Sequence, residues 1–224
     1  MNAKELASLA INVYGAMQKQ EEFEQLLELV LKASHETILE IGSGHGGTLW
    51  AWSHLPKNKT VISVDLPGGD FGGGLTAHDK EVIENWMDPE KNTFLAAMDS
   101  HDSNTLKEVE ETLKTLTKPT LNVPMSDKWN DNRNAEVSNP YHGRVDILFI
   151  DGDHTYDGVK KDFEMYSPLV RPGGLICFHD VLDHSQTAPT CMVKEFWDAI
   201  KANYPFIEFT SDPKTWGGIG VLQW

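Results

Sequence analysis

The sequence has little cysteine, little positive charge and no long apolar run. Its 224 residues include two cysteines, Cys177 and Cys191, too few for a disulfide framework and typical of a reducing cytoplasm, so we expect two buried thiols that act as small apolar groups. The 19 Lys and Arg against 34 Asp and Glu give a net charge of −15, which would repel nucleic-acid phosphate and anionic membranes. Since no apolar run reaches the about 18 residues of a membrane span, we expect a cytoplasmic protein that binds neither nucleic acid nor membrane.

The most informative segment is 37–47, TILEIGSGHGG. An apolar strand over 37–41 passes into a glycine-rich turn and then into the start of a helix at 48–54. A second apolar run, 60–64, ends in Asp65, whose carboxylate could accept hydrogen bonds from two ribose hydroxyls. Because glycines let the backbone approach a ligand closely, this pair of motifs predicts a nucleotide-type cofactor site.

The glycine spacing alone leaves the cofactor open. Gly42, Gly44 and Gly47 also satisfy the GxGxxG pattern of dinucleotide-binding folds. Glu40 would place a carboxylate near a cationic ligand group, which suits the ammonium of S-adenosylmethionine better than a pyrophosphate. Two strand-like runs, 206–210 and 218–223, predict a terminal hairpin at a sheet edge, which is less common in dinucleotide domains. The sequence therefore favours a methyl donor over NAD.

The elements alternate along the chain in the manner of a parallel sheet with crossover helices. Besides those above we expect helices over 3–17, 21–33, 103–116 and 193–203 and strands over 92–97, 145–150 and 174–179. We predict one α/β domain over 1–224: a doubly wound, mostly parallel seven-stranded Rossmann-like sheet with N-terminal helices (1–34) and a C-terminal antiparallel hairpin. Residues 117–143 lack periodicity and predict a lid or mobile loop, whose Trp129 and Tyr141 could contact an acceptor.

Polar residues follow the predicted strands where each one ends. Asp65, Asp99, Asp151, His179 and Asp180 should meet at the carboxyl edge of the sheet. Acids that lie so close repel one another, and a divalent cation is the simplest compensation. Asp151, His179 and Asp180 are therefore a candidate metal set that leaves positions for water and substrate oxygens. The alternative is that Asp151 only caps or orients its loop.

The segments ILEIGSGHGGTLW, SVDLPGG, FIDGDHTYDGVKKDF and PLVRPGGLICFHDV resemble class I S-adenosylmethionine-dependent methyltransferases. More narrowly, residues 37–181 are similar to the cephalosporin-hydroxylase-like and macrolide-sugar O-methyltransferase group. The resemblance implies a metal held at Asp151, His179 and Asp180, with His154 as general base. His179 stands where those relatives carry Asp or Glu. An imidazole ligand suits manganese, iron or zinc better than magnesium, and a metal-free site with His179 as base stays open.

We therefore predict O-methylation of a hydroxyl on a small acceptor, a sugar or natural product, with S-adenosylmethionine and a divalent metal, Mg or Mn. Methyl transfer needs an in-line oxygen nucleophile that loses its proton, and His154 and Asp151 are the catalytic candidates. The expected donor-binding residues are Glu40, Gly42, Ser43, Gly44, Asp65, Leu66, Asp99, Ser100 and Asp151. An NAD-dependent oxidoreductase and a noncatalytic cofactor-binding module remain alternatives, and a homodimer through the N-terminal helices is possible.

Overall fold

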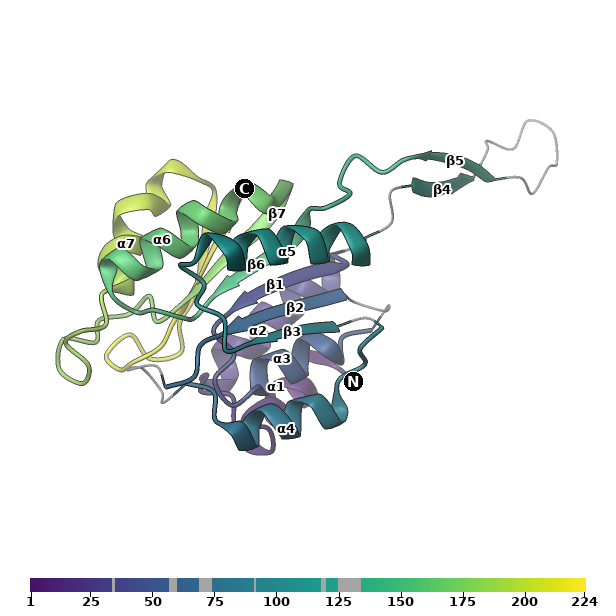
Figure 1. Cartoon of the computed structure of the whole chain (residues 1–224). Helices are drawn as coiled ribbons and strands as arrows, with labels where there is room; N and C mark the ends of the chain where they lie inside the picture. The colour runs from purple at the N-terminus through teal and green to yellow at the C-terminus, as the bar shows by residue number, and fades with distance from the viewer. Residues whose placement is uncertain (34, 57–59, 69–73, 91, 118–119, 125–133) are drawn as a thin grey trace.

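The computed structural model describes the chain except residues 34, 57–59, 69–73, 91, 118–119 and 125–133 (Figure 1). A sheet of seven strands forms its centre, in the order β3-β2-β1-β6-β7-β9-β8. The strands are β1 (Thr37–Ile41), β2 (Thr60–Asp65), β3 (Asn92–Ala96), β6 (Val145–Ile150), β7 (Val170–His179), β8 (Phe206–Phe209) and β9 (Ile219–Gln223). The first five pair in parallel, and β9 pairs antiparallel with both β7 and β8. The predicted fold class and terminal hairpin are confirmed.

Helices cover both faces of this sheet (Figure 1). One face carries α1 (Ala3–Asn12), α2 (Gln20–Lys32), α3 (Gly47–Ser53) and α4 (Ala77–Trp86); the other carries α5 (Ser103–Leu116), α6 (Tyr156–Tyr166) and α7 (Val193–Ile200). Short 3-10 turns, Ser167–Leu169 and Lys201–Asn203, follow α6 and α7. Among the helices described, none has the length and apolar character needed to cross a membrane.

The two faces of the sheet bury two apolar cores. Along β1, Ile38 packs with the core under α1 to α4, whereas its neighbour Leu39 packs with the core under α5 to α7. Ile147 and Leu148 of β6 divide in the same way, because successive side chains of a strand point to opposite faces. Both faces of the central strands are therefore buried, which explains their continuous apolar runs.

Two predicted boundaries differ from the structure by four residues or more, and one helix was not predicted. The first helix ends at Asn12 rather than at residue 17, and Gly15 follows it with a φ of +76°, a left-handed conformation that ends a helix. The last parallel strand begins at Val170, before its two glycines, instead of at residue 174. Helix α4 was not predicted; a capping box of Thr76 and Asp79 begins it, which is a sequence signature of a helix start.

The prediction of a long loop without secondary-structure elements over 117–143 is wrong for its described part. β4 (Thr120–Pro124) and β5 (Asn134–Ser138) form an antiparallel pair of their own, and it projects from the sheet (Figure 1). Pairing between two short strands is satisfied by backbone groups, so it needs no strong side-chain periodicity. Trp129 lies outside the described residues.

The hairpin formed by β4 and β5 leaves the domain at the edge where β6 and β7 begin. The ring of Tyr141 lies 5.4 Å from the guanidinium carbon of Arg171, at the start of β7. The candidate site lies at the other ends of these strands. Tyr141 is therefore not at the candidate site of its own molecule, and the described part of 117–143 is not placed as a lid over it.

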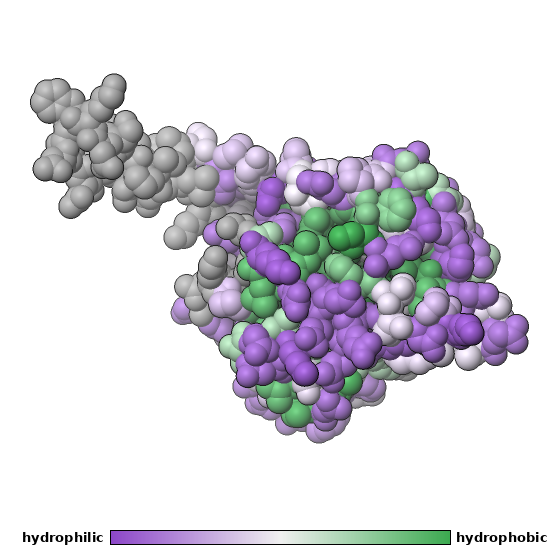
Figure 2. All heavy atoms as spheres, turned by 180° about the vertical axis from the view of Figure 1, so that it is seen from behind, coloured by the Kyte–Doolittle hydropathy of each residue, from purple (hydrophilic) through white to green (hydrophobic). Residues whose placement is uncertain are grey.

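Figure 2, the view from behind, shows mostly hydrophilic side chains on that face of the molecule, with apolar ones gathered in smaller patches.

Candidate active site

The glycine-rich turn between β1 and α3 lies directly against the loop that follows β6. Gly42 has a φ of +85°, and a Cβ there would lie 2.1 Å from the carbonyl oxygen of Asp151. The backbone N–H of Asp151 donates to the carbonyl of Ile41 at 2.8 Å. Glycine at position 42 therefore allows the predicted donor loop and the predicted catalytic loop to touch.

Asp65 joins the end of β2 to the same turn. Its Oδ2 accepts hydrogen bonds from the backbone N–H groups of Ser43 and Gly44, each at 2.6 Å, and from the Ser43 hydroxyl at 3.0 Å. Burial raises the pKa of Asp65, although these hydrogen bonds oppose the shift. Asp65 thus lies at the predicted donor loop, and its contact with a ribose stays a prediction.

Glu40 is fully buried beneath the turn. Its carboxylate accepts hydrogen bonds from the indole N–H of Trp52 at 3.0 Å and from the Ser63 hydroxyl at 2.8 Å. Burial raises the pKa of Glu40 to about 7, although hydrogen bonds from Thr48, Ser63 and Trp52 lower it. Side chains of α3 and β2 already donate hydrogen bonds to this carboxylate. Its contact with the ammonium of S-adenosylmethionine stays a prediction.

The remaining predicted donor residues surround the turn at neighbouring strand ends. Asp99 follows β3 and accepts a hydrogen bond from the backbone N–H of His101 at 2.8 Å. The carbonyl of Ser100 accepts one from the Tyr166 hydroxyl of α6 at 2.7 Å. Leu66, just after β2, is exposed. These groups lie along the carboxyl edge of the sheet, where α/β folds bind ligands.

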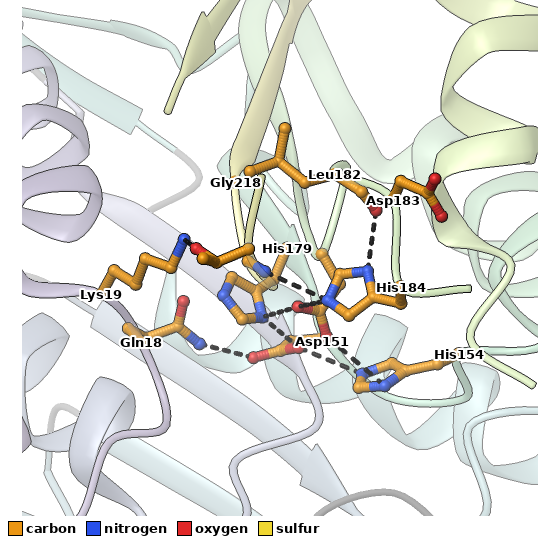
Figure 3. A network of polar contacts seen from close by, with 12 residues as sticks. Gln18, Lys19, Asp151, His154, His179, Leu182, Asp183, His184 and Gly218 are labelled. Carbon is orange, nitrogen blue, oxygen red and sulfur yellow. Dashed lines mark hydrogen bonds and ion pairs between the residues drawn. The ribbon is translucent and has the colours of Figure 1, made fainter. Parts of the chain in front are cut away.

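The structure brings the three predicted metal ligands together. Asp151 follows β6, His179 ends β7, and Asp180 comes next with a φ of +61°. The Nδ1 of His179 lies 3.2 Å from Asp151 Oδ1 and 3.4 Å from Asp180 Oδ1 (Figure 3). One donor atom from each of the three lies within 4.8 Å of the others.

His154 lies beside this group, as the resemblance implies. Its Nε2 is 3.2 Å from Asp151 Oδ1, and its Nδ1 is 3.6 Å from Asp180 Oδ2 (Figure 3). Burial opposes protonation of this ring, but the two carboxylates outweigh burial and raise the pKa of His154. Between two carboxylates the ring is held in one orientation, which a general base requires.

Two further residues complete the cluster, and the sequence analysis missed both. The amide of Gln18, between α1 and α2, donates to Asp151 Oδ2 at 2.7 Å, and His184 Nε2 lies 3.0 Å from Asp180 Oδ1 (Figure 3). Gln18 carries no sequence signal, because it comes from an element 133 residues away. His184 has one signal, its spacing of four residues from Asp180.

The carboxylates and imidazoles of the cluster shift one another's pKa values. Burial would raise the pKa of Asp151 and Asp180, but the neighbouring imidazoles outweigh it and lower both. The same carboxylates raise the pKa of His179 against the effect of its burial. Among the described residues, the buried Asp180 Oδ1 and His179 Nε2 have no hydrogen-bond partner. An orphaned carboxylate oxygen beside nitrogen and oxygen donors fits a divalent cation.

An aromatic side chain from the terminal hairpin borders the cluster. The ring of Trp216 lies 6.3 Å from that of His179, and Lys19 Nζ lies 5.6 Å from the Trp216 ring. The loop that carries Trp216 is anchored by Glu22, whose buried carboxylate accepts hydrogen bonds from Ser211 and Gly218. Trp216 is 42% exposed, so it is an aromatic surface available beside the site.

Comparison with known proteins identifies the family to which this chain belongs. A family model described as a methyltransferase domain matches residues 39–181, more than half of the chain. An uncharacterized protein of Sinorhizobium fredii is 34% identical over 82 residues, 36% of this chain and 8% of that protein. An uncharacterized protein of Acanthamoeba polyphaga mimivirus is 52% identical over 40 residues, 18% of each. The chain thus matches only a small part of the length of these curated relatives.

Solved structures share the fold. A candidate caffeoyl-CoA O-methyltransferase of Staphylococcus aureus superposes with a TM-score of 0.62 at 14% identity, over 100% of this chain and 92% of that one. An O-methyltransferase of Bacillus cereus in complex with SAH gives 0.55 at 17% identity, over 99% and 90%. The methyltransferase MycE with Mg, SAH and mycinamycin VI gives 0.58 at 16% identity, over 100% and 54%. At such identities the likeness supports the fold alone.

Proposed function

We propose that this chain, which belongs to the methyltransferase domain family, transfers a methyl group from S-adenosylmethionine to a hydroxyl oxygen of a small acceptor. One observation carries the proposal: the glycine-rich turn touches the loop of Asp151, where Gly42 leaves no room for a Cβ. A donor bound at the turn would therefore lie beside the cluster of His154, Asp151 and Asp180. Methyl transfer requires this proximity between donor and proton acceptor.

In this proposal the donor is held by the turn and the neighbouring strand ends. The donor-binding residues are Glu40, Gly42, Ser43, Gly44, Asp65, Leu66, Asp99, Ser100 and Asp151. Backbone N–H groups at the start of α3 and the carboxylate of Asp65 are the polar groups nearest the turn. Asp65 would exchange part of its hydrogen bonding to the turn for the ribose hydroxyls.

A divalent metal, Mg or Mn, would be held by Asp151, His179 and Asp180, and the imidazole of His179 favours Mn over Mg. When bound, it would lower the pKa of an acceptor hydroxyl and offset the two carboxylates. Gln18 orients Asp151 through its amide hydrogen bond. His154 would then take the acceptor proton, because its ring is the base that Asp151 and Asp180 orient.

The surroundings of the cluster support a proposal for the acceptor class. Trp216 offers an exposed ring next to His179, and an aromatic face can pack against a sugar or another ring. Among the similar structures, MycE is crystallised with mycinamycin VI, and TomG of Streptomyces achromogenes is involved in tomaymycin synthesis. We therefore infer a hydroxylated sugar or natural product as the acceptor.

The first test is calorimetric titration of S-adenosylmethionine, and of NAD as the control, with and without Mg²⁺ or Mn²⁺. We expect binding of S-adenosylmethionine but not NAD, and a metal-dependent heat that Asp151→Asn abolishes. Asp157→Asn is the matched control, because Asp157 is an exposed carboxylate at the start of α6. Binding of NAD alone would favour the oxidoreductase alternative, and binding of neither nucleotide would overturn the proposal.

A second test separates catalysis from simple donor binding. Once an acceptor is found by screening hydroxylated compounds for release of S-adenosylhomocysteine, His154→Ala should lower kcat by about 10²- to 10⁴-fold with little change in donor affinity. The wild-type rate should rise with pH as the His154 imidazolium loses its proton. The carboxylates alone raise the pKa of His154, and a bound metal that offsets their charge should move this rise to lower pH. Unchanged activity in His154→Ala would remove it as the base.

The oligomeric state is a separate prediction. A homodimer would place exposed apolar side chains of the N-terminal segment, such as Leu9, Val13 and Met17, against a second copy. Light scattering after size exclusion measures the mass directly. A monomer at micromolar concentration would remove the homodimer from the proposal without touching the site.

A further inference from the structure

Cys191 packs in the apolar core and also lies next to His154, the candidate base. It precedes α7, is buried with a free thiol, and has its sulfur within 4.8 Å of donor atoms of His154 and Asp180, which also lie within that distance of one another. The backbone fixes this neighbourhood, because Met192 N–H donates to the carbonyl of His154 at 2.7 Å. Cys177, the second free thiol, is buried in β7.

We propose that His154, Asp180 and Cys191 form a second metal position, which takes a thiophilic divalent ion such as Zn²⁺. Imidazole, carboxylate and thiolate are the ligands that zinc prefers, at about 2.0 to 2.3 Å. Donors of one tetrahedral zinc then lie about 3.3 to 3.8 Å apart, so the observed spacing needs only small side-chain rotations. Magnesium, which prefers oxygen ligands, is a poor match to this set.

Asp180, which the two metal sets share, is a carboxylate that a nearby cation would stabilise. Its buried Oδ1 has no hydrogen-bond partner among the described residues. His184 Nε2 lies 3.0 Å away, but this nitrogen accepts a hydrogen bond from Gly217 N–H, while Nδ1 lies 2.7 Å from the Leu182 carbonyl. While the His184 ring is neutral, with its proton on Nδ1, it has none to give to Asp180. The negatively charged Oδ1 of Asp180 then lies beside the electron-rich Nε2 of His184 with no proton between them, and a nearby cation would stabilise it.

Asp180 also belongs to the metal set with Asp151 and His179, so the two positions would share one carboxylate. Binding at the second position is coordination: the Cys191 thiol releases its proton to solvent, and no redox step is involved. If the proposed function holds, zinc would also occupy a ring nitrogen of His154 and so inhibit methyl transfer. Zinc would then act as an inhibitor at a site next to the catalytic metal.

Cobalt provides a direct probe, because Co²⁺ replaces Zn²⁺ and thiolate ligation adds an intense near-ultraviolet charge-transfer absorption. We expect this absorption when Co²⁺ is titrated into the full chain, and displacement by Zn²⁺ but not by Mg²⁺. Cys191→Ser should abolish it, and Cys177→Ser should retain it as the matched control. Cobalt binding without the charge-transfer absorption, no cobalt binding, or loss of the absorption in Cys177→Ser alone would overturn the proposal.

A second measurement needs no variant. Alkylation of the wild-type chain, followed by peptide mass spectrometry, should show that Zn²⁺ protects Cys191, while the rate at Cys177 stays unchanged. Equal rates at Cys191 with and without zinc would contradict the proposal even if Cys191→Ser failed to fold. Neither readout uses methyl transfer, so a cobalt signal without S-adenosylmethionine binding would overturn the proposed function and leave the zinc position standing.

Discussion

At the scale of single residues, Glu40 is a carboxylate that the fold buries completely. Its pKa rises from about 4.5 to about 7, chiefly through burial. Between these values the native state binds more protons than the unfolded chain, so the contribution of Glu40 to the free energy of unfolding falls as pH rises. The fall amounts to about 3 kcal/mol from pH 4 to pH 8.

The variant Glu40→Gln should therefore lack this pH dependence. We expect the stability of Glu40→Gln relative to the wild type to increase between pH 5 and pH 8, as measured by urea unfolding at each pH. Glu36→Gln is the control, because Glu36 lies just before β1 and its side chain is exposed. A stability difference that does not change with pH would show that the carboxylate of Glu40 is ionised throughout.

Gly42 carries a second prediction at this scale. Gly42→Ala combines a φ of +85° with a Cβ placed 2.1 Å from the Asp151 carbonyl oxygen, so we expect a loss of about 3 kcal/mol or more and no binding of S-adenosylmethionine. Gly68→Ala isolates the backbone effect, since Gly68 has a φ of +78° and nothing within 4 Å of its added Cβ; its cost should be about 1 kcal/mol. Equal losses in both variants would mean that contact between the two loops is unimportant.

At the scale of elements, α6 joins two parts of the proposed active site. The helix begins after the loop of Asp151 and His154, and its last residue, Tyr166, donates to the carbonyl of Ser100 beyond β3. His101, in the same loop as Ser100, lies 3.3 Å from the buried Asp162 of α6. The position of α6 thus fixes the loop after β3 relative to the loop after β6.

Tyr166→Phe tests this link by removing one hydroxyl group from a buried ring. Loss of the hydrogen bond to Ser100 should cost about 1 kcal/mol of stability and weaken S-adenosylhomocysteine binding about fivefold. Tyr156→Phe is the matched control on the same helix, where the ring packs against Phe196. If calorimetry gave the same affinity in all three proteins, the loop of Ser100 would not belong to the donor site.

At the scale of the whole molecule, the strands and the edge at which they end can be predicted from the sequence. Side chains that reach this edge from loops elsewhere in the chain cannot. The sheet and its terminal hairpin could be predicted because buried parallel strands are continuous apolar runs. The proximity of Asp151, His179 and Asp180 could be predicted because parallel strand ends share one edge. Gln18 and Trp216 could not, because each reaches the cluster from an element remote in the chain.

The hairpin of β4 and β5 provides the last prediction. Its base is closed by Thr117, whose hydroxyl lies 3.1 Å from His142 Nδ1 and accepts a hydrogen bond from Gly143 N–H at 2.9 Å. A short Gly-Ser linker in place of residues 119–138 should therefore leave the domain intact. Because the hairpin leaves the sheet at the edge opposite the site, affinity for S-adenosylhomocysteine should stay within about twofold.

Calorimetry and light scattering on the shortened and the full chain distinguish the roles of the hairpin. An unchanged affinity and an unchanged number of subunits would show that the segment serves neither the donor site nor assembly. A large loss of affinity in a shortened chain that remains folded and monomeric would contradict the placement of the hairpin away from the site. A loss of affinity that accompanies a change from dimer to monomer would instead mean that the hairpin acts on the site of a second copy, because within one molecule the sheet separates the two.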